Sequence, residues 1–263
     1  MNIRHDIHLH TTLSYCAKES ATPENYIEIA KKKGLSTIGF SDHVWDTAVS
    51  PAINDFYEGQ DAERLLSASL PKAEGIRILR GCEAELDKNG VLGLSEEAAK
   101  KFDYVLCTHS HSQHPEVIDA KVKKDPKKLA ETLCDRFSLL VEHPMSKYIT
   151  AIAHPFFPLG NKDDFDEVLF RISDDRLEDL FNDAVYKNIA IEINAAAFAS
   201  LPLKSIHKSE MFRIYETAKE CGCKFVFGTD CHDPKIYDER FSYLEALCAL
   251  LEITDEDLCP LVK

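Results

Sequence analysis

The chain has 263 residues, of which 44% are hydrophobic and 29% are charged, and its formal net charge is −14 at pH 7. This composition is that of an ordinary folded protein and excludes a disordered one. The acidic balance argues against nucleic acid bound by the general surface, and no apolar run approaches the roughly 20 residues of a membrane span.

The first residues and the cysteines indicate the cellular compartment. The N-terminal sequence MNIRHDIHLH lacks the apolar stretch of a signal peptide, so we expect a cytoplasmic protein. Nine cysteines are scattered along the chain. Because this number is odd and no export signal is present, reduced thiols are favoured over a disulfide framework.

Seven short β-rich segments alternate with helical ones. We predict strands over residues 6–10, 37–41, 76–85, 104–108, 149–154, 189–194 and 225–228. We predict helices over residues 23–33, 62–70, 127–141, 176–187, 209–220 and 240–251, and a polar surface loop over 161–166. Thr22-Pro23 and Asp125-Pro126 have the chemistry of helix starts, and Gly34 has that of a helix end.

This alternation predicts the fold class. Parallel strands need crossover connections, which the helices provide, so we expect an α/β protein with either a barrel or an open sheet. No internal repeat, low-complexity tract or Gly/Ser linker divides the chain. We therefore expect a single domain over residues 1–263.

Most of the eleven histidines lie at or just beyond the end of a predicted strand. They are His8, His10, His43, His109, His111, His154 and His232. In a β/α barrel the carboxyl ends of all strands share one face, and that face is where active sites are found. Imidazoles that converge there indicate a metal site.

The spacing within these motifs suits metal binding. His8 and His10 point to the same side of a strand, because side chains alternate with period two, and can hold one cation together. Asp42-His43 and Asp230-Cys231-His232 follow apolar strands in the same way.

A carboxylate on the third strand adds a harder ligand to this set. Glu83 follows the apolar residues of its strand and can bridge two ions, while Glu85 competes with it on the same strand face. His154, in Ala153-His154-Pro155, closes the set.

The order of these motifs resembles that of the PHP (polymerase and histidinol phosphatase) family. The motifs are His8-Leu9-His10-Thr11, Asp42-His43, Gly81-Cys82-Glu83, Thr108-His109, His154-Pro155 and Gly228-Thr229-Asp230-Cys231-His232. The resemblance spans nearly the whole chain and implies a distorted seven-stranded (β/α)7 TIM-like barrel, the PHP fold. It also implies a phosphoesterase that holds two or three divalent ions of zinc, manganese or iron.

Carried over by position, the resemblance assigns the ligands. The expected metal ligands are His8, His10, Cys16, His43, Glu83, His109, His111, His154, Asp230 and His232. The residues expected to contact these ligands or the substrate are Asp42, Glu192, Asn194 and Lys18. Glu83 would bridge two ions, and His8 with His10 would share one.

Two positions depart from the family pattern. Cys16 stands where many members have a histidine, and it either binds zinc, which a thiolate does well, or merely packs. In Thr108-His109-Ser110-His111, two histidines compete for one ligand position. We favour His109 and leave His111 to bind metal or to touch the substrate.

The resemblance and the residue chemistry together predict hydrolysis of a small phosphate monoester. A hydroxide that bridges two ions attacks phosphorus in line, and Asp230, His232 or His154 carries the protons. Candidate phosphate contacts are Lys18, Arg80 and Lys204, although a solvated surface position is favoured for each. Among substrates, resemblance alone favours L-histidinol phosphate, and hence histidine biosynthesis.

Three further hypotheses stay open, and all share the metal site. The chain can be a phosphoesterase for nucleoside phosphates or other small esters, a metal-dependent amidohydrolase, or a non-catalytic metal-binding barrel in which the change at Cys16 has emptied a site. The expected partner is a small phosphorylated molecule, not a membrane or nucleic acid. The sequence does not define the oligomeric state.

Overall fold

Eight short strands form one parallel sheet in the computed structural model, which describes residues 2–161, 165–199 and 201–263. They are β1 His5–Leu9, β2 Thr37–Phe40, β3 His43–Val44, β4 Arg77–Glu85, β5 Tyr104–Thr108, β6 Ala151–Ile152, β7 Ala190–Asn194 and β8 Phe225–Gly228. Their order is β1-β2-β4-β5-β6-β7-β8, and β3 pairs with β4. Because β2 and β3 pair with successive parts of β4, the eight strands occupy seven positions.

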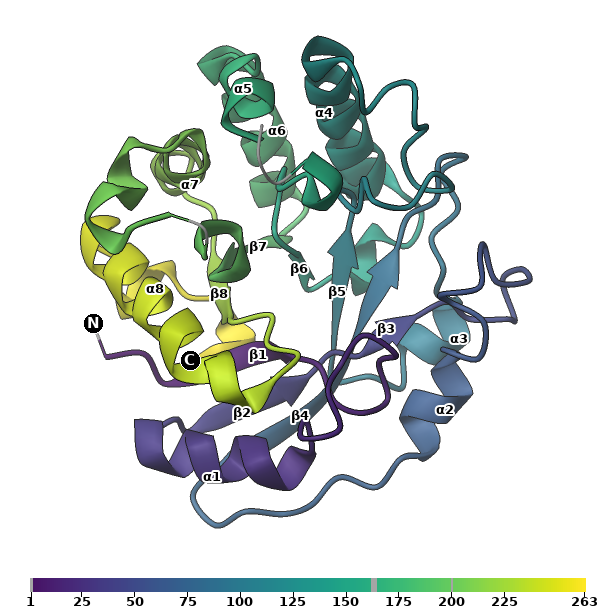
Figure 1. Ribbon diagram of the computed structural model, residues 1–263, viewed down its shortest axis with the longest axis vertical. Helices are drawn as coiled ribbons and strands as arrows, with labels where there is room; N and C mark the ends of the chain where they lie inside the picture. Colours follow the sequence, from purple (N-terminus) through teal and green to yellow (C-terminus); the bar gives the residue numbers. More distant parts are fainter. Residues whose placement is uncertain (1, 162–164, 200) are drawn as a thin grey trace.

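The sheet closes on itself just beyond the ends of β8 and β1. The backbone N–H of Asp230 donates to the carbonyl of His8 at 2.9 Å, and that of His10 donates to the carbonyl of Cys231 at 3.1 Å. The strands therefore form a nearly closed, distorted barrel in the centre of the molecule (Figure 1). The predicted seven-stranded TIM-like barrel is confirmed.

Helices surround this barrel (Figure 1). They are α1 Pro23–Lys33, α2 Ala62–Ser67, α3 Glu96–Ala99, α4 Pro126–Glu142, α5 Phe165–Phe170, α6 Asp174–Tyr186, α7 Glu210–Glu220 and α8 Tyr237–Leu250. None of the helices in the described ranges combines the length and apolarity needed to cross a membrane.

The predicted helix starts have the expected cap geometry. The Thr22 side chain accepts a hydrogen bond from the Asn25 N–H at the start of α1, and Gly34 ends this helix at φ 70°. The Asp125 side chain accepts from the N–H groups of Lys127 and Lys128 at the start of α4. These contacts satisfy backbone groups that a helix end leaves without partners.

Tyr104 fills the barrel interior beneath the carboxyl ends of the strands. Its ring lies against Gly39 and Gly81, where an added Cβ would overlap the ring atoms. Its hydroxyl donates to the carbonyl of Ile7 at 2.6 Å. This contact joins β5 to β1 across the barrel and closes the core below the residues of the candidate site.

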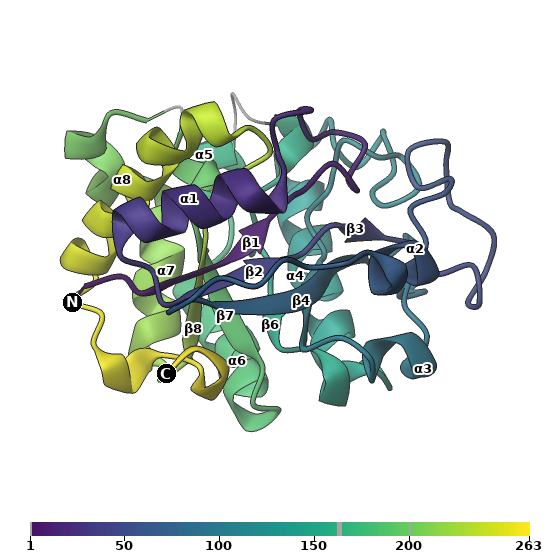
Figure 2. The same cartoon turned by 90° about the horizontal axis from the view of Figure 1, so that it is seen from below.

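The two chain ends lie at the opposite end of the barrel from the candidate site. Figure 2 shows the N- and C-terminal labels on the same side of the molecule. Asn2 and Arg4, just before β1, line one shallow pocket together with Leu258, Val262 and Lys263.

The sequence did not predict the shortest elements. Strand β3 and helices α3 and α5 are absent from the prediction. They have two, four and six residues, and segments this short carry little periodicity. The predicted strand over 149–154 is reduced to Ala151–Ile152. Of the predicted loop over 161–166, residues 162–164 lie outside the described part, and Phe165 already begins α5.

Candidate metal centre

Glu83 lies at the centre of a buried cluster of imidazoles. Its Oε2 atom is 2.8 Å from Nδ1 of His43 and 3.5 Å from Nε2 of both His8 and His10. Its Oε1 atom is 2.8 Å from Nε2 of His154. The side chains come from β1, β3, β4 and the end of β6, so the barrel rim brings together residues that are far apart in sequence, as expected.

Asp230 and His232, after β8, extend the cluster. Oδ1 of Asp230 is 3.3 Å from Nε2 of His10 and 3.7 Å from Nε2 of His8. Nδ1 of His232 is 3.5 Å from the same carboxylate oxygen, and its ring stacks on that of His10 with centroids 3.9 Å apart. Asp230 thus faces the two histidines of the HxH motif.

Two residues of the cluster have a backbone conformation that residues other than glycine rarely adopt. The φ angles are 28° at His154 and 52° at Asp230. Such left-handed conformations cost energy and are concentrated at functional sites. At His154 the conformation ends β6 early and directs the ring toward Glu83.

Three of the histidines are anchored through Nδ1, which leaves Nε2 directed at the cluster. Nδ1 of His8 donates to Oε1 of Glu192 at 2.6 Å. Nδ1 of His111 donates to Oε2 of Glu85 at 2.6 Å, and its Nε2 lies 3.6 Å from Oε1 of Glu83. A carboxylate behind an imidazole fixes the tautomer and exposes the other nitrogen, as is typical of histidines that bind metal.

His10 is anchored by a relay through Ser14. The Ser14 hydroxyl donates to Asp42 at 2.6 Å, so its oxygen accepts from Nδ1 of His10 at 3.0 Å. The Asp42 carboxylate also accepts from the backbone N–H and the hydroxyl of Thr11 at 2.7 and 2.8 Å. Asp42 therefore positions His10 indirectly. The sequence analysis did not identify Ser14, although it lies four residues after His10.

Glu192 and Asn194, on β7, contact the cluster from behind. Oε2 of Glu192 accepts from the backbone N–H of His154 at 2.6 Å and from Nδ2 of Asn194 at 3.0 Å. Together with the bond to His8, one buried carboxylate holds two residues of the cluster. Glu192 and Asn194 therefore lie directly behind the clustered histidines.

The preference for His109 over His111 is contradicted by the geometry. The His109 ring lies edge-on against Phe137 and Phe156, and its Nε2 accepts from the Phe156 N–H at 3.3 Å. It is therefore part of the apolar core, whereas His111 faces Glu83. The two histidines are two residues apart beyond the end of β5 at Thr108, and the order of the family motifs alone did not distinguish between them.

The three candidate phosphate contacts lie away from the cluster, as the favoured surface position implies for the two lysines. Arg80 donates to the carbonyls of Leu65, Leu66 and Ala68, outside the cluster. Lys18 and Lys204 are exposed, and neither lines the pocket over the cluster. The basic residue that does line it, Arg240 on α8, was not selected from the sequence.

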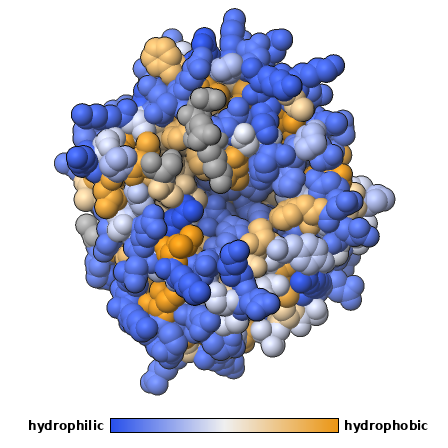
Figure 3. Space-filling view, in the orientation of Figure 1, coloured by the Kyte–Doolittle hydropathy of each residue, from blue (hydrophilic) through white to orange (hydrophobic). Residues whose placement is uncertain are grey.

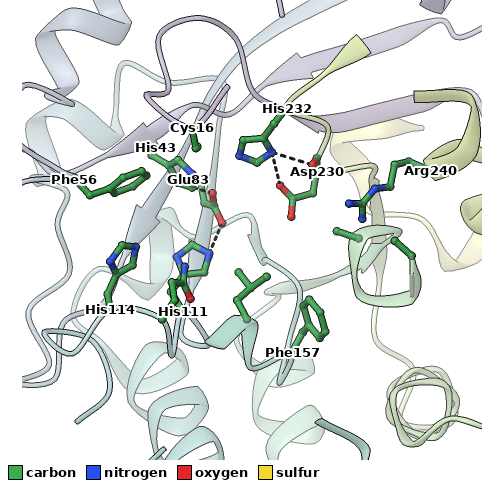
Figure 4. Close-up of a pocket in the computed structure, with 14 residues that line it drawn as sticks. Cys16, His43, Phe56, Glu83, His111, His114, Phe157, Asp230, His232 and Arg240 are labelled. Atoms are coloured by element: carbon green, nitrogen blue, oxygen red, sulfur yellow. Dashed lines mark hydrogen bonds and ion pairs between the residues drawn. The ribbon is translucent and has the colours of Figure 1, made fainter. Parts of the chain in front are cut away.

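Cys16 lies at the pocket beside His43 and His232 (Figure 4). Burial raises the pKa of the Cys16 thiol, but hydrogen bonds with His232 and His43 outweigh this effect and lower the pKa to about 6. The thiol thus lies beside two of the expected metal ligands.

The electrostatics keep the two acids ionised. Burial alone would raise the pKa of Glu83, but the charges of His43 and His8 hold it well below its usual value. Burial would also raise the pKa of Asp230, but the charge of His8 and the hydrogen bond with His10 hold this pKa well below its usual value. Burial lowers the pKa of His8, yet Glu192, Asp230 and Glu83 raise it well above the usual value. A bound metal cation can take the place of the positive charge that protonated histidines supply between these acids.

The donor atoms fit divalent cations. Ligand atoms lie within 4.8 Å of one another in three overlapping sets. The sets are His8, His10 and Asp230; His8, Glu83 and His154; and His10, His43 and His232. Oε2 of Glu83 is buried and makes no hydrogen bond with any described residue. Imidazole nitrogen and carboxylate oxygen suit zinc, manganese and iron.

A cavity of about 670 Å³ opens onto this cluster. Figure 3 shows that the corresponding face of the molecule is hollowed near its centre and bordered in part by hydrophobic side chains. The lining residues include Glu83, Asp230 and His232 at the cluster, with Phe56 and His114 on another wall (Figure 4). This volume accommodates a small-molecule ligand.

The PHP domain family matches residues 6–196 of the chain. The chain belongs to this family. The resemblance of the motifs is thereby confirmed. The matched range includes the HxH pair, Asp42-His43, Glu83, His111 and His154. It ends before Asp230, although the fold places Asp230 beside His10 in the same cluster.

Several PHP relatives share most of the chain. A probable phosphatase of Caldicellulosiruptor bescii is 28% identical over 228 residues, covering 86% of this chain and 79% of the relative. A probable phosphatase of Thermoanaerobacter sp. strain X514 is 29% identical over 229 residues, covering 86% and 78%. These names confirm the predicted enzyme class, a phosphatase of the PHP family.

Two other matches are of a different kind. The DNA polymerase/3'-5' exonuclease PolX of Bacillus subtilis is 25% identical over 241 residues, which cover 90% of this chain but 35% of that protein. The crystal structure of histidinol phosphate phosphatase from Lactococcus lactis subsp. lactis, complexed with zinc, L-histidinol and phosphate, has a TM-score of 0.62 at 18% identity and covers 95% of this chain and 94% of its own. At this identity the likeness confirms the barrel fold.

Proposed function

We propose that this PHP phosphatase uses two or three divalent metal ions to hydrolyse a small phosphate monoester, with L-histidinol phosphate as the first candidate substrate. The observation that carries the proposal is the set of histidines whose Nδ1 atoms are tied to Glu192, Glu85 and Ser14 while their Nε2 atoms face Glu83. A divalent cation at that position would be coordinated by these inward-facing nitrogens and by the buried carboxylates.

The proposed ligands divide among the sets that the fold brings together. His8, His10 and Asp230 would hold one ion, and Glu83 would bridge to the ions held with His43, His232, His154 and His111. When bound, such ions supply positive charge for the phosphoryl oxygens and lower the pKa of water, so that a nucleophile exists near neutral pH. The thiol of Cys16 would add a ligand suited to zinc.

Proton transfer falls to residues that reach the pocket. Asp230 and His232 both line the cavity, whereas His154 is buried behind Glu83 and is not among the described lining residues. Burial lowers the pKa of His232, but Cys16 and Asp230 raise it above its usual value. We therefore assign the proton for the leaving alcohol to His232, with the ionised Asp230 beside it, and His154 to metal binding.

The shape of the pocket supports a small ester with a flat alcohol. The rings of Phe56 and His114 lie 5.1 Å apart on the wall beside His43, where they offer an aromatic surface to an imidazole or a nucleobase. The crystal structure with the same fold contains L-histidinol and phosphate. The net charge of −14 favours a small substrate over nucleic acid.

A metal-dependence assay with a substrate panel tests the proposal. Protein stripped with a chelator is resupplied with Mn²⁺, Zn²⁺ or Fe²⁺, and phosphate release is measured from p-nitrophenyl phosphate, L-histidinol phosphate and nucleoside monophosphates. We expect metal-dependent turnover, with the highest kcat/KM for L-histidinol phosphate. Hydrolysis of an amide added to this panel, with no phosphate released from any ester, would reject the proposal, and so would no turnover with any ion. A preference for a nucleoside monophosphate would reject the substrate only.

Two variants test the assigned residues in the same assay. His10→Ala and Asp230→Asn should each retain less than about a tenth of the wild-type activity, because each removes a ligand atom that no neighbour replaces. Lys18→Ala serves as the control, since Lys18 is exposed and does not line the pocket. Thermal unfolding of all three proteins separates loss of chemistry from loss of fold.

A further inference from the structure

The pocket over the metal cluster has a single permanent positive charge. Among its described lining residues, Arg240 is the one arginine or lysine, and Glu83 and Asp230 are the acids. The chain as a whole carries a net charge of −14. A phosphate ester approaching this pocket therefore meets one fixed cation of the protein itself, in addition to any bound metal.

Arg240 lies in the first turn of α8 and reaches the pocket from the side of Asp230. In Figure 4 its guanidinium group lies beside Asp230 and His232, across the pocket from Phe56 and His114. Although Arg240 lies on the side of Asp230 in this view, it forms no ion pair within 4.0 Å with any described carboxylate. The charge is thus not neutralised by the chain.

The guanidinium of Arg240 also has an unused donor. Its Nη1 atom is buried and has no hydrogen-bond partner in the described part of the chain. The buried Arg136 shows the contrast, since its Nε and both Nη atoms donate to the carbonyls of His109, Asp87 and Leu86. A buried charged donor without an acceptor is costly, so an acceptor from a ligand is expected at this place.

We propose that Arg240 binds the phosphoryl group of the substrate and orients it over the metal cluster, an assignment that rests on the proposed phosphatase function. A guanidinium presents parallel N–H donors that match two oxygens of a phosphoryl group. Because Arg240 and the aromatic pair of Phe56 and His114 lie on different walls, the phosphoryl group is placed beside Asp230 and the alcohol extends toward the rings.

Direct binding of inorganic phosphate tests this assignment without requiring turnover. Titration calorimetry is carried out on metal-loaded wild type, Arg240→Ala and Arg240→Lys, with Arg4→Ala as a control because the Arg4 side chain is exposed at the far end of the barrel. Metal content is measured for each protein. We expect the Kd for phosphate to rise about 10- to 100-fold in Arg240→Ala and less in Arg240→Lys, as for loss of a hydrogen bond to a charged group.

Two further measurements complete the test. Millimolar guanidinium ion should restore phosphate binding to Arg240→Ala but not change it in wild type, since only the alanine variant leaves space for it. In steady-state assays of Arg240→Ala, the inhibition constant of phosphate as a competitive inhibitor should rise in parallel with the KM for the ester. Unchanged metal content in Arg240→Lys keeps the result decisive where the alanine variant is poorly folded.

The outcomes separate this assignment from the proposed function. An unchanged Kd for phosphate in Arg240→Ala and Arg240→Lys, or no phosphate binding by the wild type, would overturn the assignment. A higher KM for the ester with unchanged phosphate binding would also overturn it, because Arg240 would then contact the alcohol. Arg240-dependent phosphate binding in a wild type that hydrolyses no phosphate ester would support the assignment and reject the function.

Discussion

Nδ1 of His8 lies 2.6 Å from Oε1 of Glu192, although 184 positions separate the two residues in the chain. Both side chains are fully buried. The contact sets the tautomer of His8, because a carboxylate can accept only from a protonated Nδ1, and Nε2 is then left with a lone pair directed at Glu83 and Asp230. The other Glu192 oxygen holds the backbone of His154.

Substitution of Glu192 by glutamine should therefore weaken metal binding without removing a ligand. The amide of Glu192→Gln can donate to Nδ1 of His8 and so favour the wrong tautomer. We expect metal affinity to fall about 10- to 100-fold, the usual effect of losing a hydrogen-bond partner of a metal-binding histidine. Competition with a chromogenic chelator measures the affinity. The exposed Glu178→Gln is the control, and equal affinities for the two variants would contradict this account.

Gly228 is the residue that lets Glu192 approach His8. A Cβ at this position would overlap Oε1 of Glu192 and would lie 2.5 Å from Cβ of His8. Gly228→Ala should thus displace Glu192, reduce metal affinity as Glu192→Gln does, and destabilise the fold by about 1–3 kcal/mol through overpacking.

Gly34→Ala provides the matched control for this substitution. Gly34 has φ 70°, and a Cβ there would meet no atom within 4 Å. Alanine at this helix end should cost about 1 kcal/mol of stability and leave metal affinity unchanged. Chemical denaturation and chelator competition on both variants give the two quantities, and a Gly228→Ala protein with wild-type metal affinity would refute the explanation.

His109 and His111 should respond differently to the same substitution. His111→Gln removes the imidazole that faces Glu83, so we expect at least about a tenfold loss of metal affinity. His109→Gln keeps an acceptor near the Phe156 N–H and should lose only about 1 kcal/mol of stability, with its metal content unchanged. Elemental analysis after gel filtration compares the two, and the reverse ranking would restore His109 as the ligand.

The sequence predicted those parts of the site that follow from strand periodicity. His8 and His10 are two residues apart, so strand alternation places them on the same side, and both side chains do point toward Glu83. The choice between His109 and His111 rested on the order of the family motifs, because alternation cannot separate two histidines that are two residues apart, and it selected His109 although His111 is the one that faces Glu83.

Other site residues had no local signal. Ser14 contacts His10 across a turn, and a serine is common at any surface. Glu85 was noted as a competitor of Glu83, but its contact with His111 exists only in the folded chain. Arg240 lies eight residues after His232, in a helix whose charged residues are expected to face solvent. Only the closed barrel brings this side chain to the pocket.

His5 should make the fold sensitive to acid. Its ring stacks on Phe227 with centroids 4.5 Å apart, and its Nε2 accepts from the Phe227 N–H at 3.0 Å. Burial lowers the pKa of His5 to about 3. The unfolded chain therefore binds one more proton than the native protein between pH 3 and the usual histidine pKa of 6.5, so stability falls as the pH is lowered through this window.

The substitution His5→Gln isolates this effect, since its amide oxygen can replace Nε2 as the acceptor but does not titrate. Between pH 6 and 4, the free energy of unfolding of the wild type should decline more steeply than that of the variant, by about 1.4 kcal/mol per pH unit. Urea denaturation in the presence of chelator gives the slopes without a contribution from metal release. The exposed His207→Gln should follow the wild type. Parallel curves for wild type and His5→Gln would show that the buried ring of His5 does not cause the loss of stability in acid.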